Sequence, residues 1–84
     1  MALTEKQREL ILRLDKQAKQ ILPNGGEEAL LMFLVDNIQE LKSIIYFPDK
    51  SELDTYCQQY DGFYQCMKLL ERWALAISNG SIKV

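Results

Sequence analysis

Residues 53–77 read LDTYCQQYDGFYQCMKLLERWALAI, and their apolar positions recur at alternating intervals of three and four residues. This spacing places the side chains on one stripe of an α-helix, whereas a strand would alternate with a period of two. The sequence therefore predicts a helix over residues 50–78 with one covered face. The stripe consists of Leu53, Tyr56, Tyr60, Phe63, Met67, Leu70, Ala74 and Ile77.

A second stripe lies beside the first on the same expected helix. A helix with two apolar stripes is typical of a bundle in which each helix touches two others. The Asp61-Gly62 pair could also end one helix and begin another, which would give four helices. The unbroken phase of the first stripe favours a continuous helix. The second stripe consists of Gly62, Cys66, Leu69, Trp73 and Ala76.

Two turn signals precede this region, Pro23-Asn24-Gly25-Gly26 and Phe47-Pro48-Asp49. Both disfavour the continuation of a helix. They divide the chain into helices over residues 4–22, 26–46 and 50–78, within a single domain of residues 1–84. We therefore predict an all-α fold, an antiparallel three-helix bundle with short loops that forms a dimer.

Capping residues support these boundaries. Thr4 and Gln7 fit a capping box, Asn24 is a candidate N-cap of the second helix, and Asp49 with Glu52 could cap the third. The first two helices each have an apolar face that should turn inward. These faces consist of Leu3, Gln7, Leu10, Leu14, Ala18 and Ile21 in the first helix and Leu31, Leu34, Ile38, Leu41 and Ile45 in the second.

The composition argues against most kinds of catalytic and metal site. The chain has 84 residues, a net charge of −2 and no histidine, so His-based general bases and nucleophile pairs cannot form. Cys57 and Cys66 lie half a helical turn out of phase, which predicts two free thiols in a reducing compartment, most simply the cytoplasm. We therefore expect no catalytic residue, no metal, no cofactor and no small-molecule substrate. Residues 29–35 form the longest apolar run, far shorter than the roughly twenty residues of a membrane span.

The candidate functional residues are apolar side chains that the predicted core does not use. Ala29, Met32 and Phe33 form a patch on the back of the second helix, and Tyr64 and Trp73 flank the main stripe of the third. Such patches usually mark contact sites, so we expect a protein partner or a homodimer. The nearby carboxylates, Asp36 and Glu40 on the second helix, are interpreted as part of a solvated face rather than a metal site.

The sequence thus favours a small non-enzymatic interaction module, such as a regulator, adaptor, inhibitor or assembly factor. The length and helical hairpins are typical of small bacterial adaptors and inhibitors, although no residue pattern assigns the chain to a family. The alternative is a nucleic-acid-binding transcriptional regulator. It is disfavoured because the net charge is −2 and the basic residues of the first helix alternate with Glu5, Glu9 and Asp15 on a solvated face. Glu9–Arg13 and Asp15–Lys19 are expected to form i,i+4 pairs there.

Overall fold

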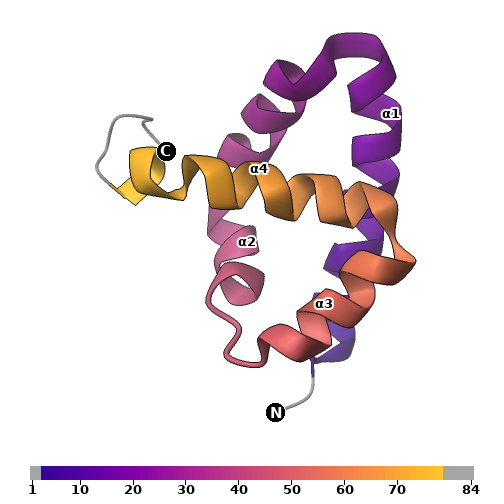
Figure 1. Cartoon of the computed structure of the whole chain (residues 1–84), viewed down its shortest axis with the longest axis vertical. Coiled ribbons are helices and arrows are strands. Elements are labelled where there is room, and N and C mark those ends of the chain that lie inside the picture. The colour runs from indigo at the N-terminus through magenta and orange to yellow at the C-terminus, as the bar shows by residue number, and fades with distance from the viewer. Residues whose placement is uncertain (1–2, 79–84) are drawn as a thin grey trace.

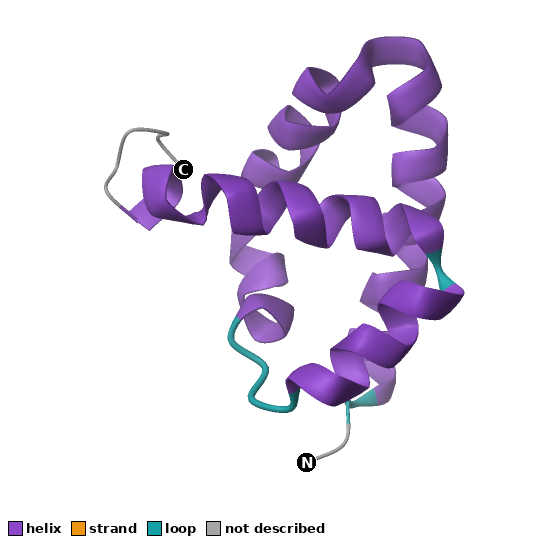
Figure 2. Cartoon of the chain, in the orientation of Figure 1, coloured by secondary structure: helices purple, strands orange, loops and turns teal. Residues whose placement is uncertain are grey.

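The computed structural model describes residues 3–78, with side chains through residue 73, and every element within that range is a helix (Figures 1 and 2). The all-α class is therefore confirmed. The helices are α1 (Glu5–Asp36), α2 (Ile38–Ile45), α3 (Lys50–Gln59) and α4 (Asp61–Ser78). None of these helices combines the length and apolar character needed to cross a membrane.

Helix α1 begins with the predicted capping box, since Thr4 Oγ1 accepts from the Gln7 N–H and the Gln7 side chain accepts from the Thr4 N–H. It is interrupted at Gly26, whose φ of 73° and ψ of −167° suit glycine best. The helix consequently folds back at this residue into a first arm, residues 5–25, and a second arm, residues 27–36 (Figure 1). The prediction that Asn24 caps the second helix is wrong. Its amide donates to the Gln20 carbonyl oxygen at 2.7 Å, because helical turns continue beyond Pro23.

The predicted second helix, residues 26–46, is divided at Asn37. The Asn37 amide donates to the Phe33 carbonyl oxygen at 2.8 Å, and this local bond competes with regular helix geometry. Leu34, Ile38 and Leu41 are buried as predicted on both sides of this break, whereas Leu31 and Ile45 are only half-buried. The buried face instead consists of Leu30, Leu34, Ile38, Leu41 and Ile44.

The continuous third helix is also wrong, and the alternative with a break beside Gly62 is what the structure contains. Tyr60 separates α3 from α4 in an extended conformation, with φ −124° and ψ 97°. Its N–H still donates to the Tyr56 carbonyl oxygen at 2.8 Å, and its own carbonyl accepts from the Tyr64 N–H at 3.0 Å. A single-residue joint therefore changes the direction of the helix while the stripe keeps its phase. The start of α3 is as predicted, since the Asp49 carboxylate accepts from the Glu52 N–H.

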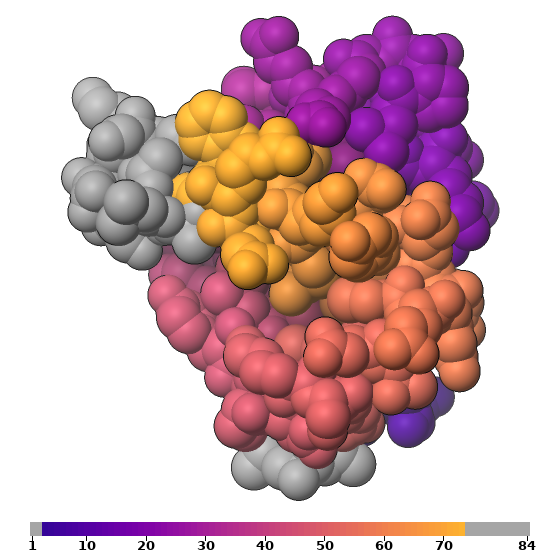
Figure 3. Space-filling model, in the orientation of Figure 1, coloured from indigo at the N-terminus to yellow at the C-terminus, as the bar shows by residue number. Residues whose placement is uncertain are grey.

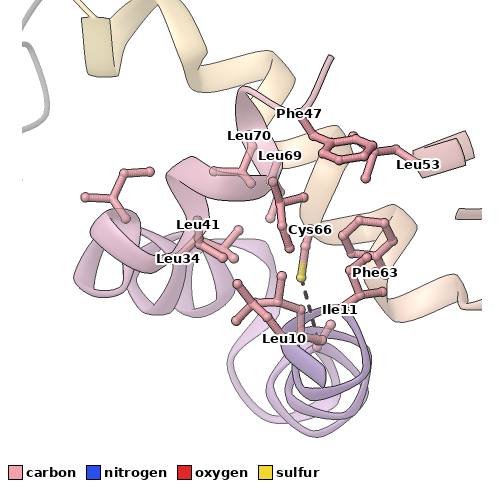
Figure 4. Close-up of a cluster of buried hydrophobic side chains, with 14 of the residues drawn as sticks. Leu10, Ile11, Leu34, Leu41, Phe47, Leu53, Phe63, Cys66, Leu69 and Leu70 are labelled. Atoms are coloured by element: carbon pink, nitrogen blue, oxygen red, sulfur yellow. Dashed lines mark hydrogen bonds between the residues drawn. The ribbon is translucent and has the colours of Figure 1, made fainter. Parts of the chain in front are cut away.

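Helix α4 crosses both arms of α1 and closes the core (Figure 1). Its Cys66 lies against Leu14 of the first arm, and its Arg72 forms an ion pair with Glu27 of the second. Phe63 is fully buried, whereas Tyr56 and Tyr60 are half-buried and stack with ring centroids 6.2 Å apart. Both stripes of the predicted third helix thus contribute to the core, while the side chains of Ala74, Ala76 and Ile77 lie outside the described residues. Figure 4 shows the core side chains Leu10, Ile11, Leu34, Leu41, Phe47, Leu53, Phe63, Cys66, Leu69 and Leu70.

Candidate functional site

A groove of about 700 Å³ lies between α2, α3 and α4. The pairs of helices that pack closely are α1 with α4, α3 with α4, and α1 with α2. Helix α2 is therefore held by α1 and does not close against α3 or α4. In the view of Figure 1, α4 lies higher than α2 and α3. In the same view in Figure 3, the side chains of α3 and α4 form neighbouring parts of the face towards the reader. The helix packing thus leaves a groove beside the core, where the half-buried side chains of Ile45, Cys57 and Met67 meet solvent.

The floor of the groove is apolar and belongs to the core. Leu53 of α3 and Leu70 of α4 are 2% and 5% exposed, and they reach the groove from the same cluster that fills the interior. Half-buried residues from all three helices extend this floor outward. An occupant would therefore cover apolar surface that the fold leaves partly in contact with water. The apolar floor residues are Ile38, Ile45, Leu53, Cys57, Met67 and Leu70.

Two tyrosines stand at the edge of the groove. Tyr46, directly after α2, is 75% exposed, and Tyr64 on α4 is 42% exposed. The Lys68 ammonium lies 5.4 Å from the centroid of the Tyr64 ring, which is a cation–π geometry. Tyrosine offers a large, stiff contact surface with a polar tip, and it is enriched where binding energy is concentrated.

Three lysines give the groove a basic edge: Lys42 and Lys68 each lie four residues from one of these tyrosines, and Lys50 begins α3. Lys42, Lys50 and Lys68 line it together with the two carboxylates Asp54 and Glu71. The Lys50 ammonium also donates to the Ile45 carbonyl oxygen at 3.0 Å, where the end of α2 leaves unpaired carbonyls. The groove therefore carries more basic than acidic groups, in a chain whose net charge is −2.

The two thiols have different surroundings, and both are free as predicted. Cys57 is half-buried in the groove, where burial and then the charge of Asp54 raise its thiol pKa. Cys66 is fully buried beside α1, and burial, with a further contribution from Asp15, raises its thiol pKa to about 12. A raised pKa lowers the thiolate fraction, so neither thiol has the surroundings of a catalytic nucleophile.

The sequence interpretation missed a buried carboxylate. Asp15 was expected on a solvated face of the first helix, but it is only 8% exposed. Its Oδ1 accepts from the Gly62 N–H at 2.8 Å, and its Oδ2 accepts from Lys19 at 3.0 Å, the i,i+4 pair that the sequence predicts. The available signal was the apolar line Ile11, Asp15, Ala18, which places Asp15 beside buried neighbours. Because both of its oxygens are bonded, Asp15 acts as a structural cap on α4 rather than as an acid or base.

The structure separates the five predicted interface residues. Tyr64 lies at the groove, Trp73 is 38% exposed farther along α4, and Met32 is 58% exposed on the second arm of α1. Phe33 packs against the core, and Ala29 is half-buried. The groove thus contains one of the predicted residues. It adds Tyr46 and the three lysines, whose positions on separate helices no sequence pattern connects.

A second groove of about 670 Å³, between the start of α1 and α2, is polar. Its groups already bond to one another. Arg13 forms an ion pair with Glu40, and the Gln7 amide donates to the Ser43 carbonyl oxygen. Glu40 therefore stabilises the contact between two helices and does not pair with Asp36. Within residues 3–78, no three His, Cys, Asp or Glu side chains gather in an arrangement that could hold a metal ion.

No family model, curated protein or solved structure matches this chain.

Proposed function

We propose that this protein is a non-enzymatic interaction module that holds a segment of a partner protein in the groove between α2, α3 and α4. The observation that carries the proposal is an apolar floor, continuous with the core, beside two exposed tyrosines, Tyr46 and Tyr64. Such a combination is typical of protein contact sites, in which aromatic side chains supply much of the binding energy.

The non-enzymatic part of the proposal rests on the residues themselves. The chain contains no histidine, the one thiol in the groove is Cys57, and its pKa is raised. A cysteine nucleophile needs a lowered pKa, and histidine is the most common general base. The groove therefore supplies no activated thiol and no histidine base.

The patch expected on the second helix supports a contact less strongly than the groove does. Of its three residues only Met32 is exposed, because Phe33 packs against the core and Ala29 is half-buried. A single exposed apolar side chain is ordinary on a protein surface. We therefore place the main partner contact in the groove, and a homodimer through Met32 is the secondary proposal.

A peptide-display selection tests the proposed function without a known partner. An unbiased library of 20-residue peptides is selected on the wild-type protein, and the enriched peptides are then measured on the Tyr46→Ala/Tyr64→Ala variant. We expect at least about a tenfold loss of affinity, because tyrosines at contact centres commonly contribute 2 kcal/mol or more, roughly thirtyfold.

Matched controls remove exposed apolar surface elsewhere. Met32→Ala and Trp73→Ala change side chains of comparable exposure that do not line the groove. Both variants should bind the selected peptides as the wild type does. Failure to enrich any peptide, or an equal loss of binding in Met32→Ala, would show that the groove is not the contact site. Circular dichroism and the melting temperature confirm that each variant is folded.

A further inference from the structure

We propose that the occupant of the groove is an amphipathic helix with acidic side chains on both edges of its apolar face. The inference rests on the proposed function, and it specifies the conformation and charge of the bound segment. It follows from three properties of the groove: the way its walls are built, the charges on its edges and the position of one thiol.

The walls favour a helix over an extended segment. All three walls are helices, and residues 3–78 contain no strand whose edge could pair with an extended peptide. The backbone N–H and C=O groups of an extended segment would therefore lie against apolar side chains without hydrogen-bond partners, which is costly. A helix pairs these groups internally and can place an apolar face on the half-buried residues Ile45, Cys57 and Met67.

The edges of the groove favour negative charge on that helix. Lys42, Lys50 and Lys68 come from α2, α3 and α4 respectively, and they outnumber the two groove carboxylates, Asp54 and Glu71, so the net charge beside an occupant is positive. In the described part of the chain, the ion pairs are Arg13–Glu40, Lys19–Asp15 and Arg72–Glu27, and none of them uses a groove lysine. The lysine stems can lie along the apolar floor while the ammonium groups reach partner carboxylates.

The thiol of Cys57 makes occupancy measurable. It lines the groove and is half-buried, whereas Cys66 is fully buried against Leu14. A thiol reagent therefore modifies Cys57 in the folded protein, and an occupant that covers the floor protects it. The readout needs no label and reports this one surface.

The test uses three synthetic helical peptides with the same leucines at i, i+3, i+4 and i+7. The polar positions beside the leucines are all Glu, all Gln or all Lys. Affinity is measured by fluorescence anisotropy, and occupancy is measured by the rate of Cys57 modification. We expect the Glu peptide to bind about tenfold or more tightly than the Lys peptide, to protect Cys57, and to lose this advantage as salt is raised.

Charge reversal on the protein supplies the matched pair of variants. Lys42→Glu/Lys68→Glu should invert the order of the three peptides, and Lys50 is left intact because it holds the Ile45 carbonyl oxygen. Lys6→Glu/Lys16→Glu makes the same change in net charge on α1, away from the groove, and should keep the wild-type order. Equal affinity for the three peptides, or inversion by the α1 variant as well, overturns the inference.

The outcomes also separate this inference from the proposed function. If display-selected peptides protect Cys57 but carry no excess of Asp and Glu, the interaction module stands and the acidic helix is overturned. If neither they nor the synthetic peptides protect Cys57, both fail. Protection by decanoate or by a single-stranded oligonucleotide, without protection by any peptide, assigns the groove to another ligand class and overturns both.

Discussion

Asp15 of helix α1 caps the N-terminus of helix α4 by accepting the backbone N–H of Gly62 at 2.8 Å. The two helices approach so closely here that a Cβ atom on Gly62 would lie 2.3 Å from the Asp15 carbonyl oxygen. The first backbone N–H groups of a helix have no acceptor within that helix, and a side chain from another helix can supply one. The position of α4 across α1 therefore depends on this contact.

Removing the cap should destabilise the whole fold. Asp15→Ala leaves the buried Gly62 N–H without a partner and removes the acceptor of Lys19. We expect a loss of about 1–3 kcal/mol in the free energy of unfolding, measured by urea denaturation. The control Asp36→Ala changes an exposed carboxylate at the end of α1 and should stay within about 0.5 kcal/mol of wild type. A loss in Asp15→Ala no larger than in the control would contradict the structural role of the cap.

Gly62→Ala should destabilise the protein although alanine favours a helix. The gain in helix propensity is about 1 kcal/mol. The added Cβ, however, meets backbone atoms of Asp15 that cannot rotate away, and the resulting overpacking typically costs about 1–3 kcal/mol. We expect a lower melting temperature, together with a loss of the Cys66 contact seen as faster thiol modification. A variant more stable than wild type, as the helix propensity of alanine alone would give, would mean that α1 and α4 do not meet at this point.

The stability of the fold should decrease above about pH 9, and Cys66 should cause part of the decrease. Burial raises the pKa of its thiol from 9.0 to about 12, so the unfolded chain releases this proton first. The contribution of the buried Cys66 thiol to the free energy of unfolding is fully present below pH 9, and it is lost progressively as the pH rises towards 12. At about pH 11 we expect wild type to have lost roughly 3 kcal/mol more than Cys66→Ala, relative to pH 7. The two proteins differ only at residue 66, so parallel curves would refute the assignment to Cys66.

The two thiols should differ in reactivity towards a maleimide. Cys57 is half-buried at the groove and Cys66 is fully buried, so modification of Cys66 requires the fold to open. At about pH 8.5 we expect one thiol per chain to react in the folded protein, at least about a hundredfold faster than the second. Cys57→Ser should then show only the slow reaction. Two equally fast thiols would contradict the buried position of Cys66.

Met32 should have little influence on the oligomeric state if the groove is the main contact. The sedimentation coefficients of wild type and of Met32→Glu are measured by sedimentation velocity at equal protein concentration. Because Phe33 beside it packs against the core, we expect the same sedimentation coefficient for both proteins. A dimeric wild type that Met32→Glu converts to a monomer would instead support the contact first expected at Ala29, Met32 and Phe33.

The sequence predicts the helical class and most of the local structure, because these depend on residues close in the chain. The capping box at Thr4, the cap of α3 at Asp49 and the Asp15–Lys19 pair are all found. The break at Asn37 was not predicted, and the break at Tyr60 was predicted only as the four-helix alternative at Asp61-Gly62. At Tyr60 the apolar phase continues through the joint, and at Asn37 one side-chain bond ends the helix, so periodicity alone could not locate either break.

The groove could not be predicted because it arises from how the helices are placed. Its lysines and tyrosines come from three helices, and neither their neighbours in sequence nor their helical phase connects Tyr46 with Tyr64. Tyr64 was recognised as a surface aromatic because it lies off both apolar stripes. Trp73 belongs to a stripe and is partly exposed, which shows that an apolar stripe can extend beyond the surface that covers it.

The contact between Asp15 and Gly62 also affects how the protein is made. Its two residues are separated by 47 positions, so the first arm of α1 is synthesised well before the helix that covers it. At roughly 5–20 residues per second, the nascent chain waits about 2–10 s between these two residues. During that interval Ile11 and Leu14, fully buried in the finished fold, lack the cover that α4 supplies. The period in which the newborn chain can aggregate is therefore set by its topology, and a more stable final structure would not shorten it.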